Sequence, residues 1–408
     1  MDYRWPVLAL MLLGFAWDTS LLLLKRRSAG NPMPANVADV YDAETFEKWK
    51  AYTDEKTRLG LWARAAAFLT DALLMGLCAY AAFAGLFPAG SFLQTLAVAL
   101  LSTLSGVTAL PFDWIDTMRI EAKYGFNRAS RGTFAADQVK GMLVGLALFL
   151  AIGSLLMLVH GWLGDRMILA FAAGMIALTL GISFLYPFFS RIFNKFTPLP
   201  EGELKEQLSA LLERNGYRVR AIQVMDASRR STKSNAYFTG FGKMKTIVLY
   251  DTLLESLTAD EICAVFAHEL GHGLHRDVLK QQALNAARML LLALLAWLTL
   301  RTEALFTSFG FAGVNYGFAL LLIMSVELPV LGPLMSALGS LHSRRAEYRA
   351  DAHAVKEGYG EELIRALKKL NRENYGDLTP SPLLVRLAYT HPTLSQRIAA
   401  IEGEMEKR

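Results

Sequence analysis

The chain has little cysteine and little charge for its length of 408 residues. One of its two cysteines, Cys78, lies in an apolar segment and the other, Cys263, in a polar one, so no disulfide framework is predicted. Charged residues make up 19% of the chain, whereas a soluble domain usually holds about 25%. Hydrophobic residues reach 53%, and the mean hydropathy is +0.29. This composition excludes an ordinary soluble protein and indicates a membrane protein with a substantial polar part. The net charge of +5 is modest, and we expect no nucleic-acid partner.

Seven apolar segments are long enough to cross a bilayer, which needs about 20 residues of helix. They lie at residues 5–24, 61–87, 92–111, 139–163, 167–188, 282–304 and 316–340. Lys25, Arg26 and Arg27 directly follow the first segment, whereas a cleaved signal peptide carries its basic residues before the apolar run. We therefore expect the first segment to be an uncleaved transmembrane helix.

Basic residues concentrate in alternate connections between these segments. The connections after the first, third and fifth segments, and the C-terminal tail, are rich in Lys and Arg, whereas the other connections carry at most one such residue. Basic loops stay on the cytoplasmic side, so the N-terminus is predicted outside and the C-terminus in the cytoplasm. We predict an integral multi-pass protein of the bacterial inner membrane or the endoplasmic reticulum, with its polar part facing the cytoplasm.

The pattern divides the chain into four parts: 1–189 with five transmembrane helices, a polar α+β part at 190–281, two further transmembrane helices at 282–340, and a helical tail at 341–408. In the polar part a helical stretch precedes three β-type runs, "AIQVMD", "SNAYFTGF" and "KTIVLY". A helix from Thr258 to Lys280 is predicted next, with a capping box formed by Thr258 and Glu261. The predicted fold class is mostly α, a seven-helix transmembrane bundle with an α+β domain.

The stretch "HELGH" places His268 and His272 four residues apart, on one face of the predicted helix. Two imidazoles so placed can bind one metal ion, and Glu269 lies near enough to take a proton from a metal-bound water without being a ligand. This is the H-E-x-x-H arrangement of zinc peptidases. Gly271 weakens the helix by up to about 1 kcal/mol, which makes sense if substrate or another backbone passes close to it.

The residues alone leave the third ligand open. His275 lies one turn further along the same face, although a single straight helix rarely supplies three ligands. In "SRRAEYRADAHA", Glu347 and Asp351 are again four residues apart. Glu347 could bind the metal while Asp351 holds the outer nitrogen of a ligand histidine. The alternative is an ordinary charged helix face that pairs with neighbouring arginines.

His391 precedes a proline in "YTHPTLSQRIAAIE", at a boundary between a loop and a helix. It could donate a hydrogen bond to the oxyanion of a tetrahedral intermediate, with Arg397 nearby. The alternative is a loop histidine of no consequence.

Taken together, these motifs resemble the integral-membrane zinc CAAX prenyl proteases of type I. The resemblance extends in order over nearly the whole chain, through "YDAETFEKWKAYTDEKTRLG", "RIEAKYGFNR", "YPFFSRIFNKFTPLPEGELKEQL", "SNAYFTGF", "AHELGHG", "SRRAEYRADAHA" and "THPTLSQRI". The related membrane heat-shock metalloproteases share the zinc motifs, but they are shorter and lack the N-terminal blocks.

The resemblance implies one catalytic zinc ion held by His268, His272 and Glu347, with Glu269 as general base and acid. It implies a ring of seven tilted helices around a water-filled chamber, with a gluzincin-like site above it on the cytoplasmic side. The implied reaction removes the last three residues of a prenylated C-a-a-X protein C-terminus.

The resemblance also assigns supporting roles. Asp351 would support a ligand histidine, and Asn235 would hold the substrate backbone beside an edge strand. His391 and Arg397 fall where the family places transition-state and structural support.

We therefore predict a membrane-embedded zinc endopeptidase that acts on a peptide or a prenylated protein C-terminus at the bilayer. One alternative is a membrane-protein quality-control protease, and another is a non-enzymatic chaperone or transport component with a structural metal. Glu269 favours an enzyme, because a structural site has no use for a base and usually closes its fourth position with another Cys or His. The sequence does not disclose the oligomeric state.

Overall fold

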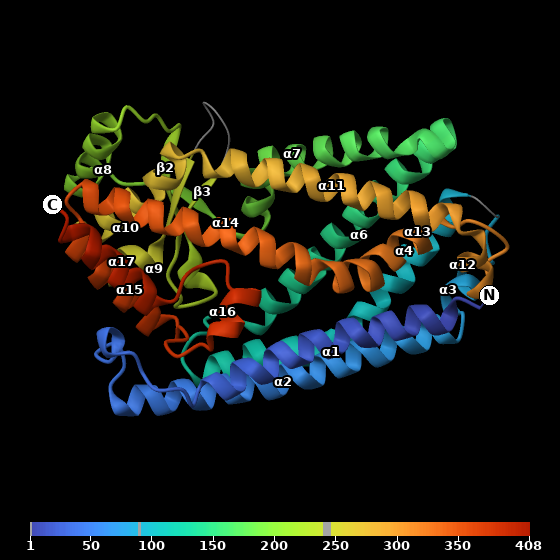
Figure 1. Ribbon diagram of the computed structural model, residues 1–408, viewed down its shortest axis with the longest axis horizontal. Coiled ribbons are helices and arrows are strands. Elements are labelled where there is room, and N and C mark those ends of the chain that lie inside the picture. The colour runs from blue at the N-terminus through green and yellow to red at the C-terminus, as the bar shows by residue number, and fades with distance from the viewer. Residues whose placement is uncertain (1, 89–90, 240–245) are drawn as a thin grey trace.

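The computed structural model describes residues 2–88, 91–239 and 246–408. Long helices run along the longest axis, and a compact part with a small sheet lies at the C-terminal end (Figure 1). The first half of the chain forms α1 (Arg4–Ser28), α2 (Ala43–Gly76), α3 (Ala79–Ala84), α4 (Phe92–Gly106), α5 (Leu110–Ile115), α6 (Arg131–Leu163) and α7 (Met167–Phe193). The compact part begins with β1 (Phe196–Pro198), α8 (Glu203–Arg214), β2 (Ala221–Met225), β3 (Ala236–Thr239), β4 (Thr246–Tyr250), α9 (Asp251–Ser256) and α10 (Ala259–Leu274). The remainder forms α11 (Asp277–Arg301), α12 (Glu303–Ser308), α13 (Tyr316–Leu322), α14 (Leu328–Lys356), α15 (Gly360–Glu373), α16 (Pro382–Ala388) and α17 (Leu394–Met405).

Among the described residues, six helical stretches are long and apolar enough to cross a membrane. One of them, Arg131–Leu185, contains both α6 and α7, which are joined by a single turn at Gly164–Arg166. Gly164 has a φ of +51°, a conformation that glycine adopts at little cost and that ends α6 abruptly. Counting α6 and α7 separately gives the seven crossings that the sequence predicts, and the protein is an integral multi-pass membrane protein.

The second crossing differs from its prediction at both ends. The sequence places it at 61–87, whereas α2 already begins at Ala43 and ends at Gly76. The side chain of Asp42 caps α2 by accepting a hydrogen bond from the Thr45 backbone N–H, so the polar half of α2 is helical as well. Cys78 has a φ of +56°, which separates α2 from the short α3. The hydropathy of the sequence reveals only the apolar part of α2, so it does not predict that the helix already begins after its cap at Asp42.

The helix that carries the histidines is shorter than predicted. Its capping box of Thr258 and Glu261 is confirmed, but α10 ends at Leu274 and not at Lys280. Arg276 has a φ of +56°, and α11 begins directly after it, at Asp277. The chain therefore changes direction just after the second histidine, which brings Asp277 back toward the site described below.

The compact part contains a four-stranded sheet of order β1-β2-β4-β3. β2 and β4 are parallel, whereas β1 and β3 run antiparallel to their neighbours. The three predicted β-type runs are confirmed as β2, β3 and β4, while the segment between the last two, 240–245, lies outside the described residues. β3 is an edge strand among the described strands, so one side of its backbone is open to a further strand.

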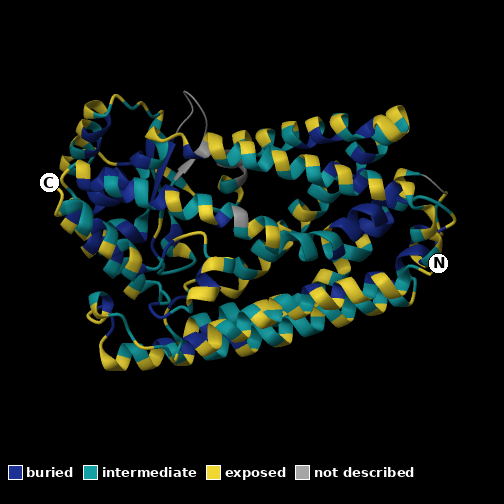
Figure 2. Cartoon of the chain, viewed as in Figure 1, coloured by how far each residue is buried: buried dark blue, intermediate teal, exposed yellow. Residues whose placement is uncertain are grey.

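The two largest hydrophobic cores among the described residues lie in different parts of the molecule. One lies in the compact part and joins α8, β4, α10, α15 and α17, and the other lies among the long helices around Phe318. Buried residues gather in α10 and around the sheet, whereas α1 and α2 are mostly half-buried or exposed (Figure 2).

Both α11 and α14 run across boundaries that the sequence analysis places at 281 and 340. The two halves are therefore connected by continuous helices, and the chamber implied by the resemblance stays a prediction.

Candidate metal centre

The site begins where α10 crosses α14. A Cβ atom on Gly271 would lie 2.9 Å from the Cα of Ala350 and 3.1 Å from the Cβ of His353, closer than such atoms approach in folded proteins. Only glycine allows the two helices to cross at this separation. The expectation that another backbone passes close to Gly271 is confirmed, and the crossing brings Glu347 of α14 to the histidines of α10.

His268, His272 and Glu347 form one group, in which a donor atom from each residue lies within 4.8 Å of the others. The Nε2 atom of His272 is 3.4 Å from Glu347 Oε1, and the Nε2 atom of His268 is 3.8 Å from Glu347 Oε2. His275, the open alternative for the third ligand, is exposed where α10 ends and is not part of this group.

These three residues fit a tetrahedral metal ion. Donor atoms about 2.0–2.2 Å from such an ion are about 3.3–3.6 Å from one another, close to the separations of 3.4 and 3.8 Å observed here. Glu347 Oε2 is buried without a well-formed hydrogen bond, although His391 Nδ1 lies 3.0 Å and Arg397 3.6 Å from it, and a metal ion would give this carboxylate oxygen a direct partner. Two imidazoles and one carboxylate are also a common donor set of catalytic zinc sites.

The outer nitrogen of His268 is held by an acidic residue. Its Nδ1 atom donates to Asp351 Oδ1 at 2.8 Å, which leaves Nε2 free to face Glu347. Arg397 of α17 donates to both oxygens of Asp351, from Nη2 at 2.6 Å and from Nε at 2.9 Å. Asp351 is only 1% exposed, so its charge depends on this partner. Arg397 thus acts on the site through Asp351 and also lies 3.6 Å from Glu347 Oε2.

His272 has an acidic partner of its own, which the sequence analysis does not identify. Its Nδ1 atom donates to Asp277 Oδ2 at 3.2 Å. Asp277 Oδ1 accepts from Arg349 at 2.7 Å and from Lys280 at 3.3 Å. The contact depends on the backbone reversal at Arg276, and no residue in the sequence marks that reversal.

A cavity of about 500 Å³ opens beside the group. Glu269 lines it next to the histidines, and it is bordered by Asn235 and by Ala236 and Tyr237 of β3. Asn235 is exposed, and its side-chain oxygen accepts the Ala236 backbone N–H at 2.9 Å. An extended peptide in this cavity would lie alongside the open edge of β3. His342 of α14 also lines the cavity, and its Nε2 atom is buried without a hydrogen-bond partner among the described residues.

His391 lies on the loop before α17 and reaches the same cavity. Its Nδ1 atom is 3.0 Å from Glu347 Oε2, while 64% of its side chain is exposed. Arg344 of α14 fixes this loop by donating to the backbone carbonyls of Val385 and Tyr389. The structure therefore brings His391 and Arg397 to the predicted ligands, although they are far from the H-E-x-x-H helix in the sequence.

Burial and neighbouring charges shift the pKa values of two residues that line the cavity, Glu269 and His272. Burial raises the pKa of the Glu269 carboxyl, and the neighbouring histidines offset this only in part. Burial lowers the pKa of His272, but contacts with Glu347 and Glu269 outweigh burial and raise it to about 9. A ligating imidazole is neutral, so a metal ion would displace the proton that His272 otherwise holds.

A buried donor group of two histidines and a glutamate, with a second glutamate in an adjacent open cavity, defines a membrane-embedded metallopeptidase. Comparison with known proteins agrees. Residues 198–405 match peptidase family M48, and residues 23–195 match the N-terminal region of CAAX prenyl proteases, described as having five membrane helices. The chain belongs to peptidase family M48, and it is an enzyme of the metalloprotease type.

Several named relatives are similar over almost the whole length. The chain is 33% identical over 425 residues to the CAAX prenyl protease 1 homolog of Oryza sativa subsp. japonica, covering 100% of this chain and 99% of the relative. It is 30% identical to the corresponding homolog of Homo sapiens, covering 95% and 93%. The crystal structure of S. mikatae Ste24p has a TM-score of 0.91 and 26% identity, and covers 98% of this chain and 99% of that chain.

Proposed function

We propose that this protein is a zinc endopeptidase that removes the C-terminal tripeptide of prenylated C-a-a-X proteins. The observation that carries the proposal is the convergence of His268, His272, Glu347 and Glu269 on one cavity bordered by an open strand edge. The names of the relatives, CAAX prenyl protease 1 homologs, supply the substrate class.

In this proposal His268, His272 and Glu347 hold the zinc ion, and Asp351 and Asp277 orient the two imidazoles. A bound zinc ion supplies Lewis acidity, which polarises a peptide carbonyl and lowers the pKa of water in an open coordination position. The remaining chemistry belongs to side chains of this chain.

Glu269 is the proposed general base and acid. It takes a proton from the attacking water as the water oxygen bonds to the scissile carbonyl carbon. It then passes that proton to the leaving nitrogen as the C–N bond breaks, so that the products are a carboxylic acid and an amine. The acid then gives up its proton, so that the products separate as a carboxylate and an ammonium group. Burial raises the pKa of Glu269, which suits a group that must hold a proton between these two events.

His391 and Asn235 are proposed to contact the substrate. The exposed imidazole of His391 is placed to donate a hydrogen bond to the oxyanion that forms on the scissile carbonyl. Asn235 directly precedes β3 and lines the cavity, where it would hold the substrate backbone. Arg397 is a positioning residue, because it acts through Asp351.

We also propose that the site faces the cytoplasm. The basic residues Lys25, Arg26 and Arg27 end α1 at the same end of the bundle as the metal centre, since Lys25 and His391 line one cavity. Basic loops remain on the cytoplasmic side of a membrane. The membrane would be the bacterial inner membrane or the endoplasmic reticulum.

The test is a cleavage assay on paired peptides that end in C-a-a-X, one farnesylated at the cysteine and one not, with products identified by mass. We expect release of the last three residues, with kcat/KM at least about tenfold higher for the farnesylated peptide because its apolar chain is buried on binding. Chelation should abolish cleavage, and zinc should restore it.

Glu269→Gln should keep its metal and lose cleavage. Equal rates for the two peptides would contradict the proposed substrate class, and near-wild-type activity of Glu269→Gln would remove Glu269 from the mechanism.

A further inference from the structure

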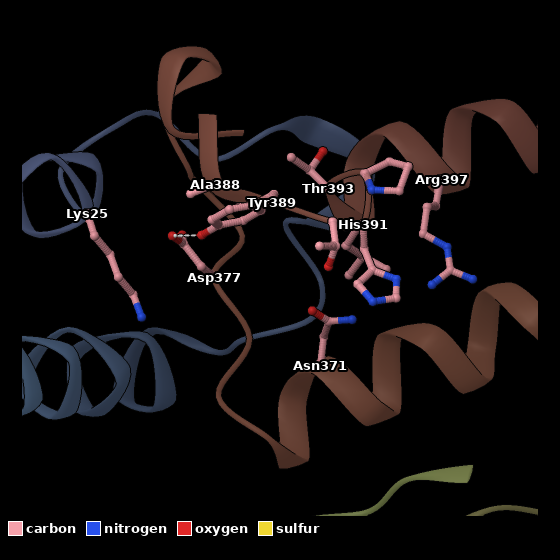
Figure 3. Close-up of a pocket in the computed structure, with 11 residues that line it drawn as sticks. Lys25, Asn371, Asp377, Ala388, Tyr389, His391, Thr393 and Arg397 are labelled. Carbon is pink, nitrogen blue, oxygen red and sulfur yellow. Dashed lines mark hydrogen bonds between the residues drawn. The ribbon is translucent and has the colours of Figure 1, made fainter. Parts of the chain in front are cut away.

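A second cavity, of about 450 Å³, adjoins the metal cavity. His391 and Arg397 line both, so the two cavities meet at the loop that precedes α17. Lys25 of α1 also lines the second cavity, and in Figure 3 it lies on the side opposite His391 and Arg397. A peptide that passes His391 on leaving the metal centre would therefore enter this second cavity.

The charged groups of this cavity differ in what they already bind. Arg397 is paired with Asp351 through two hydrogen bonds. Asp377 is also satisfied, since Oδ1 accepts the Thr379 backbone N–H at 3.1 Å and Oδ2 accepts the Tyr389 hydroxyl at 3.0 Å. Lys25 is different, because it is an exposed residue whose ammonium group has no hydrogen bond or ion pair with any residue in the described ranges. The cavity thus offers one uncommitted positive charge.

The surroundings of Lys25 favour an anion. Burial raises the pKa of Asp377 by more than its hydrogen bonds with Tyr389 and Thr379 and the charge of Lys25 together lower it, so Asp377 is less readily ionised than an exposed aspartate. The N-terminal end of α17, a helix of 12 residues, also borders the cavity at Thr393 and Leu394 and adds a positive field. A ligand with one negative charge and hydrogen-bond acceptors matches these groups.

We propose that this cavity binds the free C-terminal carboxylate of the substrate, with Lys25 as its ionic partner. The inference rests on the proposed function, because release of a tripeptide places the C-terminal carboxylate three residues beyond the scissile bond. An extended tripeptide spans roughly 10 Å, so a chain that runs past His391 would carry its end from the metal cavity toward the adjoining one. Lys25 would then fix where the chain is cut, by holding the end of the substrate at a set separation from the metal.

The experiment compares two farnesylated peptides of the same sequence, one with a C-terminal carboxylate and one with a carboxamide. For the wild-type enzyme we expect kcat/KM about tenfold higher for the carboxylate, as one charge-assisted hydrogen bond predicts. In Lys25→Gln the ratio of the two values should fall toward one, and Lys25→Arg should restore most of it. Arg27→Gln is the matched control, because Arg27 is an exposed cation of the same helix end that does not line the cavity.

Thermal unfolding of each variant will test whether the fold is retained. A wild-type ratio of one, or an undiminished ratio in Lys25→Gln, overturns the inference while tripeptide release upholds the proposed function. If the products are not tripeptides, the proposed function and the inference fail together. If Lys25→Gln slows both peptides equally and removes a stimulation by phosphatidylglycerol vesicles, Lys25 binds a lipid headgroup and the inference is wrong.

Discussion

At the scale of single residues, each histidine of the H-E-x-x-H helix has its own carboxylate. Asp351 accepts from His268, and Asp277 accepts from His272. Each carboxylate is in turn held by an arginine, Arg397 or Arg349. Such outer partners fix the tautomer and the ring orientation, so that the inner nitrogens face the metal.

Asp277→Asn tests this second support. The substitution keeps the size of the side chain but removes the charge that holds His272, Arg349 and Lys280 together. We expect zinc affinity to fall about 10–100-fold, measured by competition with a chromogenic chelator on the purified protein. Asp260→Asn, at an exposed position in the first turn of α10, should bind zinc as the wild type does. Wild-type affinity in Asp277→Asn would show that Asp277 does not orient His272.

The residues of the candidate site differ in how far the sequence could reveal them. His268, His272 and Glu269 follow from the spacing of one helix, since positions four apart share a face. The part played by Asp277 could not be predicted, because its contact depends on the left-handed backbone of Arg276, a residue type that does not favour that conformation.

At the scale of elements, the site depends on the crossing of α10 and α14. Gly271 is the point of closest approach, and Glu347 lies one turn before Ala350 on the facing helix. Neither the angle nor the separation of two helices can be read from a single sequence, and a glycine inside a helix only indicates that something passes close. The sequence therefore predicts both helices but not the contact that assembles the ligands.

Gly271→Ala tests the crossing. Its new methyl group would lie 2.9 Å from the Cα of Ala350, so α10 and α14 would have to separate. We expect the free energy of unfolding to fall by about 1–3 kcal/mol, together with a lower zinc content, measured by thermal unfolding and metal analysis. Gly403→Ala is the control, because it lies in α17 with nothing within 4 Å of the added carbon. That variant should be at least as stable as the wild type, since alanine favours a helix over glycine. Unchanged stability and zinc content in Gly271→Ala would contradict the close crossing.

At the scale of the whole molecule, a polar cluster ties the long helices to the compact part. Glu121, in the π-helical turn Asp116–Glu121 that follows α5, accepts from the Tyr52 hydroxyl at 2.7 Å and from Lys56 at 2.8 Å, both from α2. Its other oxygen lies 3.2 Å from the ammonium group of Lys233, two residues before Asn235. Because these partners are up to 181 residues apart, only the folded structure reveals that they form one cluster.

Glu121→Gln tests the importance of this cluster. The variant leaves Lys56 and Lys233 near a neutral amide. Because the side chain at this position is only 14% exposed, water replaces the lost interaction with the lysine charges poorly. We expect the free energy of unfolding to fall by about 1–3 kcal/mol, measured by thermal unfolding in one detergent. Glu55→Gln is the matched control, because Glu55 pairs with Lys123 at the surface, where ion pairs contribute little. Equal destabilisation by both variants would contradict a special role for the cluster.

The helix α14 carries Glu347 at one end and, toward its start, an internal proline, Pro333, among apolar residues. Roughly 21 Å of helix separates these two positions at 1.5 Å per residue. A small change in the inclination of α14 would therefore displace Glu347. Helices adjust their inclination when the bilayer becomes thicker or thinner, and a rotation of about 3° over that length moves the far end by about 1 Å. We therefore expect the metal affinity of the site to change when the enzyme is moved between lipids of different acyl-chain length.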